Sequence, residues 1–296
     1  MQPELGEQRL SITLVTRNRP ESLVRALRSI LGQTAQPFEI LVGDDSSTDQ
    51  ADNVRAVAEE YGARYVRGPQ RGLAANRNHL IGFAKGTHVR TMDDDHELIE
   101  GHLERCAEAI RSDPEAVWVI GESSSDASGC VYQPSCPGQL TARGVTASPP
   151  DPDACWALAD GATIYPRAVF DRGLRLPEMF PFGHAYAEFG SRLHWLGYRI
   201  RYLPTTYVIH HYHESVLRRD SVWYGDRKLI TASRLFAALS HSFIYQPTLA
   251  NRTWAVLECM KEFVRLQGAA VQSGLAAFRR HRREVLAFRV ATRHST

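Results

Sequence analysis

The sequence predicts an α/β protein with a mostly parallel, Rossmann-like sheet flanked by helices, followed by a helical C-terminal extension. Strand-like and helix-like segments alternate through the first hundred residues, which is typical of βαβ units. From residue 216 onward the segments read as helices. With 296 residues, of which 43% are hydrophobic, the chain is long and apolar enough to bury a substantial core.

The first predicted unit is a strand and a helix. Residues 10–15 form a nearly continuous apolar, β-branched run, which predicts a strand buried on both faces of a parallel sheet. Pro20 is favoured in the first turn of a helix, and the apolar residues between Leu23 and Leu31 share one helical face. Gly32 is expected to end this helix.

The second and third units repeat the pattern. Residues 38–43 predict a strand, and Asp49 is placed to cap a helix over about residues 50–61. Residues 63–66 predict a short third strand, and residues 71–78 open another helix. Residues 87–92 then predict a fourth strand.

Three consecutive carboxylates, Asp93, Asp94 and Asp95, follow the fourth strand. Such a cluster repels itself unless a positive group lies among it, and a divalent metal carrying a phosphorylated ligand would supply that charge. The alternative is an acidic turn that caps the next helix.

Polar residues gather where the predicted parallel strands end. Residues 16–19 follow the first strand, Asp44 and Asp45 follow the second, and the three aspartates follow the fourth. Ligands bind outside the carboxyl ends of the strands in such sheets, so we expect these residues to line one crevice. Carboxylates mixed with arginines fit a ligand with a heterocycle, a ribose and a diphosphate.

Two nucleotide-binding motifs are missing from the sequence. No Gly-x-Gly-x-x-Gly follows the first strand, and no Gly-x-x-x-x-Gly-Lys-Ser/Thr occurs, which argues against a dinucleotide Rossmann site and a P-loop NTPase. The net charge of only +2 argues against a nucleic-acid-binding protein.

Five stretches of the chain together resemble a known family. They are SITLVTRNRP at 11–20, QT at 33–34, FEILVGDDSSTD at 38–49, GLAANRN at 72–78 and MDDD at 92–95. Their order and spacing are similar to the N-terminal half of the family 2 glycosyltransferases of GT-A fold. The resemblance covers residues 10–110 strongly and 155–215 moderately.

The resemblance implies a metal-dependent glycosyltransferase that moves a sugar from a nucleoside diphosphate sugar to an acceptor nucleophile, with inversion. It implies a GT-A catalytic domain over residues 1–215, with a nucleotide-sugar-binding half at 10–110 and an acceptor half at 111–215. Residues 216–296 would form the helical extension. The acceptor stays open between a glycan, a lipid-linked molecule and a small molecule.

The resemblance also assigns the donor site. Thr16 and Asp45 would contact the base of a nucleotide sugar, with Asn18 and Arg19 beside them. Either Arg71 or Arg77 would lie near the base or the diphosphate. Asp93 would contact the ribose, and Asp94 would fill the middle of the family's Asp-x-Asp motif. Asp95 would bind Mn²⁺ or Mg²⁺.

A strand over residues 202–209 ends in a histidine-rich segment. The family often has a metal-binding histidine after this strand, and His210 matches that position best, with His211 and His213 close by. A structural role for His210 is the alternative.

The expected general base is where the sequence departs from the family. Aligning Arg192 and Leu193 with the family's Arg-Leu puts Ala185 and Tyr186 where an acidic pair is expected. Glu188 and His184 are the remaining candidates. For Glu188 the alternative to catalysis is a salt bridge to Arg192 at i+4. For His184 it is an imidazole that only packs within a loop. A third possibility is an acceptor that needs little help from a base.

The missing acidic pair keeps a rival function open, namely a non-catalytic nucleotide-sugar-binding protein. A sugar-phosphate nucleotidyltransferase is disfavoured, because residues 16–19 contain no glycine.

The remaining expectations concern the surroundings of the site. Residues 122–153, rich in Ser, Gly and Pro, predict a long loop with a hairpin that borders the acceptor. Residues 261–296 contain eight Lys and Arg against two Glu, and the basic run at 279–283 suits either a peripheral membrane contact or a helix packed on the domain or a partner, such as a second copy. The chain begins with a polar segment, and its cysteines are odd in number and lack zinc-type spacing, so we expect a cytoplasmic protein with free thiols. If the basic run binds lipid, the protein would be peripheral to the inner face of the membrane.

Overall fold

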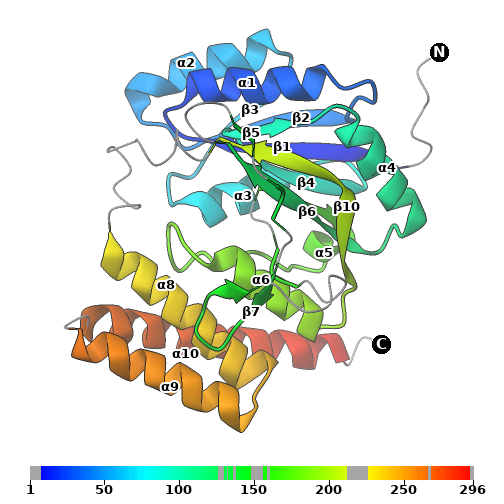
Figure 1. The fold of residues 1–296 in the computed structure, drawn as a ribbon. Coiled ribbons are helices and arrows are strands. Elements are labelled where there is room, and N and C mark those ends of the chain that lie inside the picture. The colour runs from blue at the N-terminus through cyan, green and yellow to red at the C-terminus, as the bar shows by residue number, and fades with distance from the viewer. Residues whose placement is uncertain are drawn as a thin grey trace.

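A computed structural model describes residues 8–125, 130–131, 133–135, 138–147, 156–158, 161–211, 226–265 and 268–293. Its centre is an eight-stranded sheet in the order β3-β2-β1-β4-β9-β6-β10-β5 (Figure 1). Four parallel strands form one half: β1 (Leu10–Thr16), β2 (Glu39–Asp44), β3 (Arg64–Arg67) and β4 (His88–Asp93). The predicted α/β fold with a mostly parallel sheet is confirmed.

The other half of the sheet is mixed. Strand β9 (Thr163–Pro166) is antiparallel to both β4 and β6 (Val117–Ser124), and β10 (Ile200–His210) runs parallel to β6. The edge strand β5 (His96–Leu98) is antiparallel to β10 and was not predicted from the sequence. It begins directly after the three aspartates, so the chain reverses there.

Helices cover both faces of the sheet because each strand is apolar on both sides. One core packs α1 (Pro20–Leu31), α2 (Thr48–Glu60) and α4 (His102–Ser112) on one face. The other core packs α3 (Leu73–Ile81), α5 (Ala168–Asp171) and α6 (Ala185–Trp195) on the opposite face. Gly32 ends α1 as predicted, but Ser47 rather than Asp49 precedes α2 as its N-cap, and Asp49 lies in the first turn.

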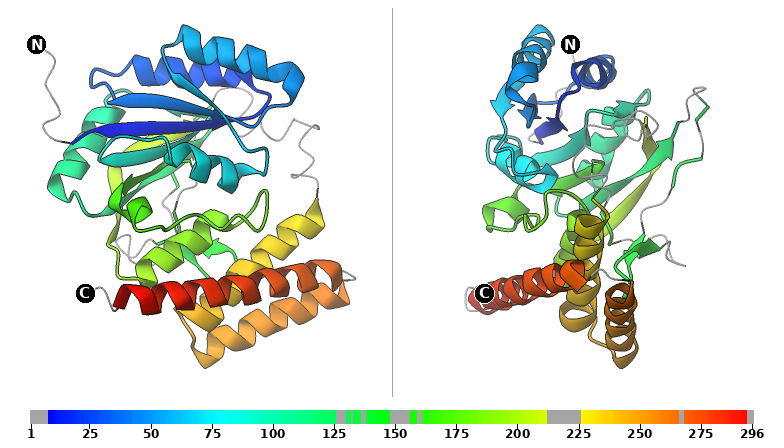
Figure 2. Two further views of the ribbon diagram at one scale, coloured as in Figure 1. Left: turned by 180° about the vertical axis from the view of Figure 1, so that it is seen from behind. Right: turned by 90° about the vertical axis from the view of Figure 1, so that its left-hand side faces the viewer.

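The C-terminal extension is helical as predicted. It contains α8 (Arg227–Ser240), the π-helical turn η2 (His241–Tyr245), α9 (Leu249–Val264) and α10 (Gly268–Arg293). Figure 2 shows these helices below α6, at the opposite end of the molecule from α1 and α2. No helix in the described part of the chain is both long enough and apolar enough to cross a membrane.

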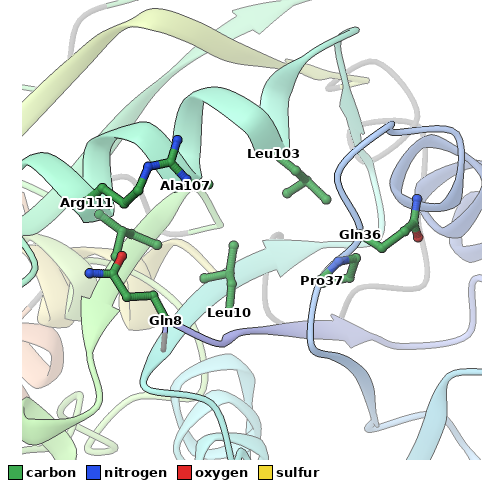
Figure 3. A pocket seen from close by; sticks show the side chains of 8 residues that line it. Gln8, Leu10, Gln36, Pro37, Leu103, Ala107 and Arg111 are labelled. Carbon is green, nitrogen blue, oxygen red and sulfur yellow. The ribbon is translucent and has the colours of Figure 1, made fainter. Parts of the chain in front are cut away.

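Smaller features complete the fold. A hairpin of β7 (Gln139–Leu140) and β8 (Thr146–Ala147) lies within the predicted loop at 122–153. A pocket of about 10 Å³ between α4 and the start of β1 holds at most a water molecule, so it is no ligand site (Figure 3). Cys106, Cys130 and Cys259 are free thiols, while Cys136 and Cys155 lie outside the described residues.

Candidate active site

The ends of β1 and β4 are tied together by side chains. The Thr16 hydroxyl donates to Asp94 Oδ2 at 2.7 Å, and Arg19 Nη1 reaches Asp94 at 2.9 Å and Asp95 at 3.0 Å. These two carboxylates are almost fully buried, at 3% and 5% exposure. The predicted convergence of the first and fourth strand ends is therefore present, with Arg19 as the positive group between two of the aspartates.

Helix α3 brings a second arginine to the aspartate cluster. Arg77 is 1% exposed, and its Nη2 lies 2.7 Å from Asp93 Oδ1. The other candidate, Arg71, is exposed and pairs with Glu178 at 3.1 Å, beside a cavity of about 450 Å³ between residues 173–179 and α10. Of the two arginines predicted near the diphosphate, Arg77 joins the aspartate cluster, and Arg71 contacts a different part of the chain.

The two carboxylates after β2 have different surroundings. Asp44 is fully buried and accepts hydrogen bonds from the Tyr65 hydroxyl at 2.9 Å and from Arg67 at 2.9 Å. Asp45 accepts from the backbone N–H of Gln70 through Oδ1, while its buried Oδ2 has no hydrogen-bond donor among the described residues. Burial raises the pKa of Asp45, against the lowering effect of its backbone hydrogen bonds.

Asn18 shapes the loop after β1. Its φ of 55° lies in the left-handed region, which asparagine tolerates better than most residues. Its side-chain oxygen accepts from the Ser47 N–H at 2.8 Å, and its own N–H donates to the Ser46 hydroxyl at 2.7 Å. Asn18 thus joins the loops after β1 and β2, and its hydrogen bonds, including one from the Ser47 hydroxyl at 3.1 Å, are to protein groups.

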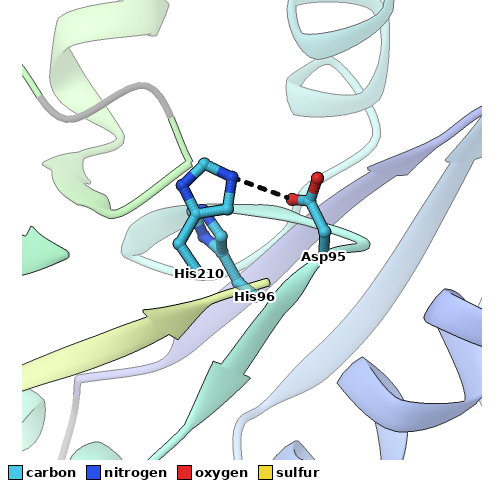
Figure 4. Close-up of side chains that lie close together, drawn as sticks. All are labelled: Asp95, His96 and His210. Atoms are coloured by element: carbon cyan, nitrogen blue, oxygen red, sulfur yellow. Dashed lines mark ion pairs between the residues drawn. The ribbon is translucent and has the colours of Figure 1, made fainter. Parts of the chain in front are cut away.

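A set of metal-ligating side chains lies where β4, β5 and β10 meet. Asp95, His96 and His210 each present one donor atom, and these atoms lie within 4.8 Å of one another (Figure 4). His96 and His210 are directly opposite in the antiparallel β5–β10 pair. Their rings are 4.7 Å apart, and His210 Nε2 lies 3.6 Å from Asp95 Oδ1.

His96 fits a metal ligand by its hydrogen bonding. Its Nδ1 lies 3.2 Å from the Gly161 carbonyl oxygen, which can only accept, so Nδ1 carries the proton. Its buried Nε2, left with a lone pair, has no hydrogen-bond partner among the described residues. A ligating histidine typically donates its other N–H to a carbonyl or carboxylate in this way.

His210 lies between two carboxylates. Its Nδ1 is 3.3 Å from Glu122 Oε2, and Asp95 lies on its other side. Burial alone would lower the pKa of His210, but hydrogen bonds and charge from Asp95 and Glu122 raise it to about 10. Burial alone would raise the pKa of Asp95, yet the hydrogen bond from His210 and the neighbouring positive charges lower it. The site therefore favours a cation, here the imidazolium itself.

His96 and Glu122 were not predicted as site residues. His96 follows the aspartates directly, but its role depends on the pairing of β5 with β10, which periodicity over three residues cannot indicate. Glu122 lies inside a segment interpreted as a loop, whereas β6 extends to Ser124 and delivers the carboxylate to His210.

The remaining histidines of this segment are placed as follows. His211 Nε2 lies 2.8 Å from Glu97, and its Nδ1 lies 3.0 Å from the Ser125 hydroxyl, so it contacts protein groups beside the cluster. His213 lies outside the described residues.

Glu188 does not lie in an open cleft. It is 0% exposed, and one carboxylate oxygen accepts from the Tyr245 hydroxyl and lies 2.6 Å from His281 Nε2. Arg192 lies 3.4 Å from the other oxygen, which is the i+4 salt bridge considered as the alternative. Burial alone would raise the pKa of Glu188, but Arg192, His281 and Tyr245 lower it to about 2. A base must reach the acceptor hydroxyl, and the i+4 salt bridge is present here, so the role of Glu188 as the base stays a prediction.

His184 lies just before α6 and is half-buried. Its Nδ1 is buried without a hydrogen-bond partner among the described residues. Burial, followed by the charge of Arg234, lowers the pKa of His184 to about 4, so the imidazole is neutral near pH 7. Its role as a base stays a prediction.

Comparisons with known proteins place these features in a family. Residues 11–172 match the model of Glycosyl transferase family 2. The GalNAc(5)-diNAcBac-PP-undecaprenol beta-1,3-glucosyltransferase of Campylobacter jejuni is 33% identical over 103 residues, which cover 32% of this chain and 32% of that protein. The chain spans about a third or less of the length of the first curated relatives it matches, from 16% to 32%.

Solved structures are similar over most of the chain. S. aureus TarS matches with a TM-score of 0.55 and 17% identity, covering 93% of this chain and 92% of that chain. GalNAc-T7, in a structure with UDP, GalNAc and Mn2+, matches with a TM-score of 0.61 and 15% identity, covering 85% of this chain and 54% of that chain. These likenesses show the fold, and the family model covers more than half of the sequence. The chain therefore belongs to glycosyl transferase family 2.

Proposed function

We infer that the chain is a metal-dependent glycosyltransferase that moves a sugar from a nucleoside diphosphate sugar to an acceptor nucleophile, with inversion at the anomeric carbon. The observation that carries this proposal is the gathering of Asp95, His96 and His210 beside the arginine-bound Asp93 and Asp94 at one edge of the sheet. The carboxylate suits both Mg²⁺ and Mn²⁺, and the two imidazoles are ligands that a transition metal accepts more readily than Mg²⁺, so this donor set favours Mn²⁺ over Mg²⁺.

The chain's own residues have separate tasks in this proposal. Asp95, His96 and His210 would hold the ion, and Asp93, oriented by Arg77, would bind the ribose. The bound metal would stabilise the negative charge of the departing diphosphate. Arg19, held by Asp94 and Asp95, is placed to add positive charge there.

Uracil is the proposed base of the donor. The structurally similar TarS has been solved with UDP and with UDP-GlcNAc, and the GalNAc-T7 structure contains UDP. In this chain Asp45 has a buried carboxylate oxygen without a donor among the described residues. An orphaned acceptor of this kind is costly, and an N–H of the base would relieve that cost.

Thermal unfolding with a panel of nucleoside diphosphates tests the donor site. UDP, GDP, dTDP, CDP and ADP are each added with and without Mn²⁺, and we expect a metal-dependent rise in Tm with UDP. A ligand at 100 times its Kd stabilises by about 2.7 kcal/mol, which is easily measured. A Tm that responds to none of the diphosphates would contradict the proposed site.

Asp95→Asn should remove the metal-dependent part of this shift, because it takes away a ligand charge while keeping the side-chain shape. Asp171→Asn is the matched control, since Asp171 is exposed on α5 and contacts only Arg167 among the described residues. An Asp95→Asn variant with unchanged Mn²⁺-dependent UDP binding would rule out the metal assignment.

A second candidate function is a nucleotide-sugar-binding protein without turnover. It is favoured by the burial of Glu188 in ion pairs and by Ala185 and Tyr186 at the position of the acidic pair. Release of nucleoside diphosphate from the donor sugar separates the two functions. If His184 is the base, His184→Gln should slow release about 10²–10⁴-fold with donor binding intact.

A further inference from the structure

Helix α9 turns its carboxylates toward the protein and its large apolar side chains toward solvent. Glu258 and Glu262 are each 4% exposed, and Ala255 is fully buried. The outward residues are large and exposed by 46% to 83%, namely Leu249, Trp254, Val256, Leu257, Met260, Phe263 and Val264. A helix on the surface of a domain normally has the reverse pattern.

Buried ion pairs fix this orientation. Arg234 of α8 lies 3.0 Å from Glu258 and 2.9 Å from Glu262, and Arg143 lies 3.2 Å from Glu258. Rotating α9 to bury its apolar face would break these pairs and leave Arg234 without its carboxylates. The apolar face is therefore held outward by the domain itself.

The outward face has an apolar centre and cationic margins. At about 100° per residue, Leu249, Val256 and Met260 share the centre of the face, with Phe263 and Leu257 on its two sides. Arg252 falls on one margin, while Lys261 and Arg265 fall on the other. The two inward glutamates are the only acidic residues between 249 and 265. They pair with Lys261 and Arg265 as well as with Arg143 and Arg234, so four cations share two carboxylates and the margins keep a net positive charge.

The position of α9 makes this face accessible. In Figure 1 and in both views of Figure 2, α9 lies at the end of the molecule away from the sheet, next to α8 and α10. A broad apolar patch at such a place marks a contact with a partner or a lipid surface.

We propose that α9 docks the protein onto an anionic lipid surface, lying in the plane of the interface with its apolar centre among the upper acyl chains. The exposed Arg252 and Arg265 would meet the lipid phosphates, as the basic margins of interfacial helices do, while Lys261 stays paired with Glu258. Trp254, exposed by 53% at the edge of the face, suits the boundary between headgroups and acyl chains.

The charge pattern favours lipid over a second copy of the chain. A two-fold dimer places the same patch on both sides, so the margins of the two α9 helices, which carry a net positive charge, would face one another. Juxtaposed like charges disfavour such a pairing. An anionic surface complements the same pattern.

Vesicle sedimentation of the full chain tests the proposal. Vesicles of phosphatidylcholine alone are compared with vesicles that also contain phosphatidylglycerol, and we expect salt-sensitive binding to the anionic vesicles. Replacing Arg252 and Arg265 together with Gln should weaken binding about 25-fold, since each cation contributes about fivefold. Quenching of Trp254 by brominated lipid, lost in Trp254→Phe, reports insertion of α9 itself.

The apolar face is tested by Leu257→Gln, Met260→Gln and Phe263→Gln in one variant, which should bind at least about tenfold more weakly. The matched control replaces Leu31 and Phe38 with Gln, because these exposed apolar residues, at 42% and 45%, lie far from α9 in the fold. Circular dichroism checks that each variant is folded.

Three results would overturn the proposal. One is no preference of the native chain for anionic vesicles, and another is equal binding by the triple variant and the control. The third is a dimer in analytical ultracentrifugation that becomes a monomer in the triple variant, which would assign the face to a second copy.

Discussion

The three consecutive aspartates have three different tasks. Asp93 pairs with Arg77, Asp94 accepts from Thr16 and Arg19, and Asp95 faces His210. Burial raises the pKa of Asp94 to about 6, against the charge of Arg19, while the pKa of Asp95 is lowered. The pKa values of these neighbouring residues thus shift in opposite directions, because burial dominates at Asp94, whereas the hydrogen bond from His210 and the nearby positive charges outweigh burial at Asp95.

His210 makes metal binding depend on pH. Its pKa rises from 6.5 to about 10 in the metal-free protein, so its proton contributes stability that is complete below about 6.5 and is lost as the pH rises through about 10. A metal must displace that proton. We expect Mn²⁺ affinity, measured by calorimetry, to rise about tenfold per pH unit between about pH 6 and about pH 8.

His210→Gln should lower the affinity and flatten this pH dependence. His79→Gln, on α3, is the control for a histidine outside the cluster and should keep the slope. A native protein whose Mn²⁺ affinity is constant over this range would contradict the assignment of His210 as a ligand.

Gly161 leaves room for two site residues. A Cβ at this position would lie 2.5 Å from Asp93 Oδ2 and 2.6 Å from His96 Cε1, closer than van der Waals contact allows. Gly161→Ala should therefore displace His96 or Asp93 and weaken Mn²⁺-dependent nucleotide binding about tenfold or more.

Gly32→Ala is the matched control for Gly161→Ala, because the added Cβ meets only the Arg28 carbonyl at 3.2 Å, at the end of α1. Equal nucleotide affinity in both variants would show that His96 is not needed for binding.

At the scale of elements, Glu188 connects three parts of the chain. It lies on α6, Tyr245 lies in η2 and His281 lies on α10, so one buried carboxylate links a helix packed on the sheet to the C-terminal helices. The π-helical turn η2 is wider than an α-helical turn, and it lies where Tyr245 contacts Glu188. We interpret this contact as the reason for the irregular turn.

Glu188→Gln should lower the free energy of unfolding by about 3–5 kcal/mol, the usual cost of breaking a buried ion pair. Denaturation with urea measures this loss, and UDP binding under folding conditions should be unchanged. Glu284→Gln, which removes an exposed i+4 pair with Arg280, is the control and should cost little. A stable Glu188→Gln variant with lost turnover would identify Glu188 as the base.

At the scale of the whole molecule, one half of the sheet could be predicted from the sequence, and the strand order of the other half could not. The parallel half of the sheet was predictable because each of its strands is a short apolar run followed by polar residues. The antiparallel insertion of β9 between β4 and β6 was not, because strand order across the sheet depends on contacts between distant segments.

The candidate site divides in the same way. Thr16, Arg19 and the aspartates follow their own strands, so local sequence placed them correctly at one edge. His96, Glu122 and the enclosure of Glu188 depend on β10 and α10, which come more than 70 residues later in the chain. The outward apolar face of α9 was hidden in the sequence because its spacing resembles that of any amphipathic helix.

The opposition of His96 and His210 across β5 and β10 has a consequence for the order of folding. Their contact closes a loop of more than a hundred residues, which is a late and entropically costly event. The nucleotide half of the sheet can form from neighbouring segments before that closure. A bound ion would then stabilise the β5–β10 pair, which forms last. Removing the metal should therefore speed amide exchange in β5 and β10 first and leave β1 and β2 protected.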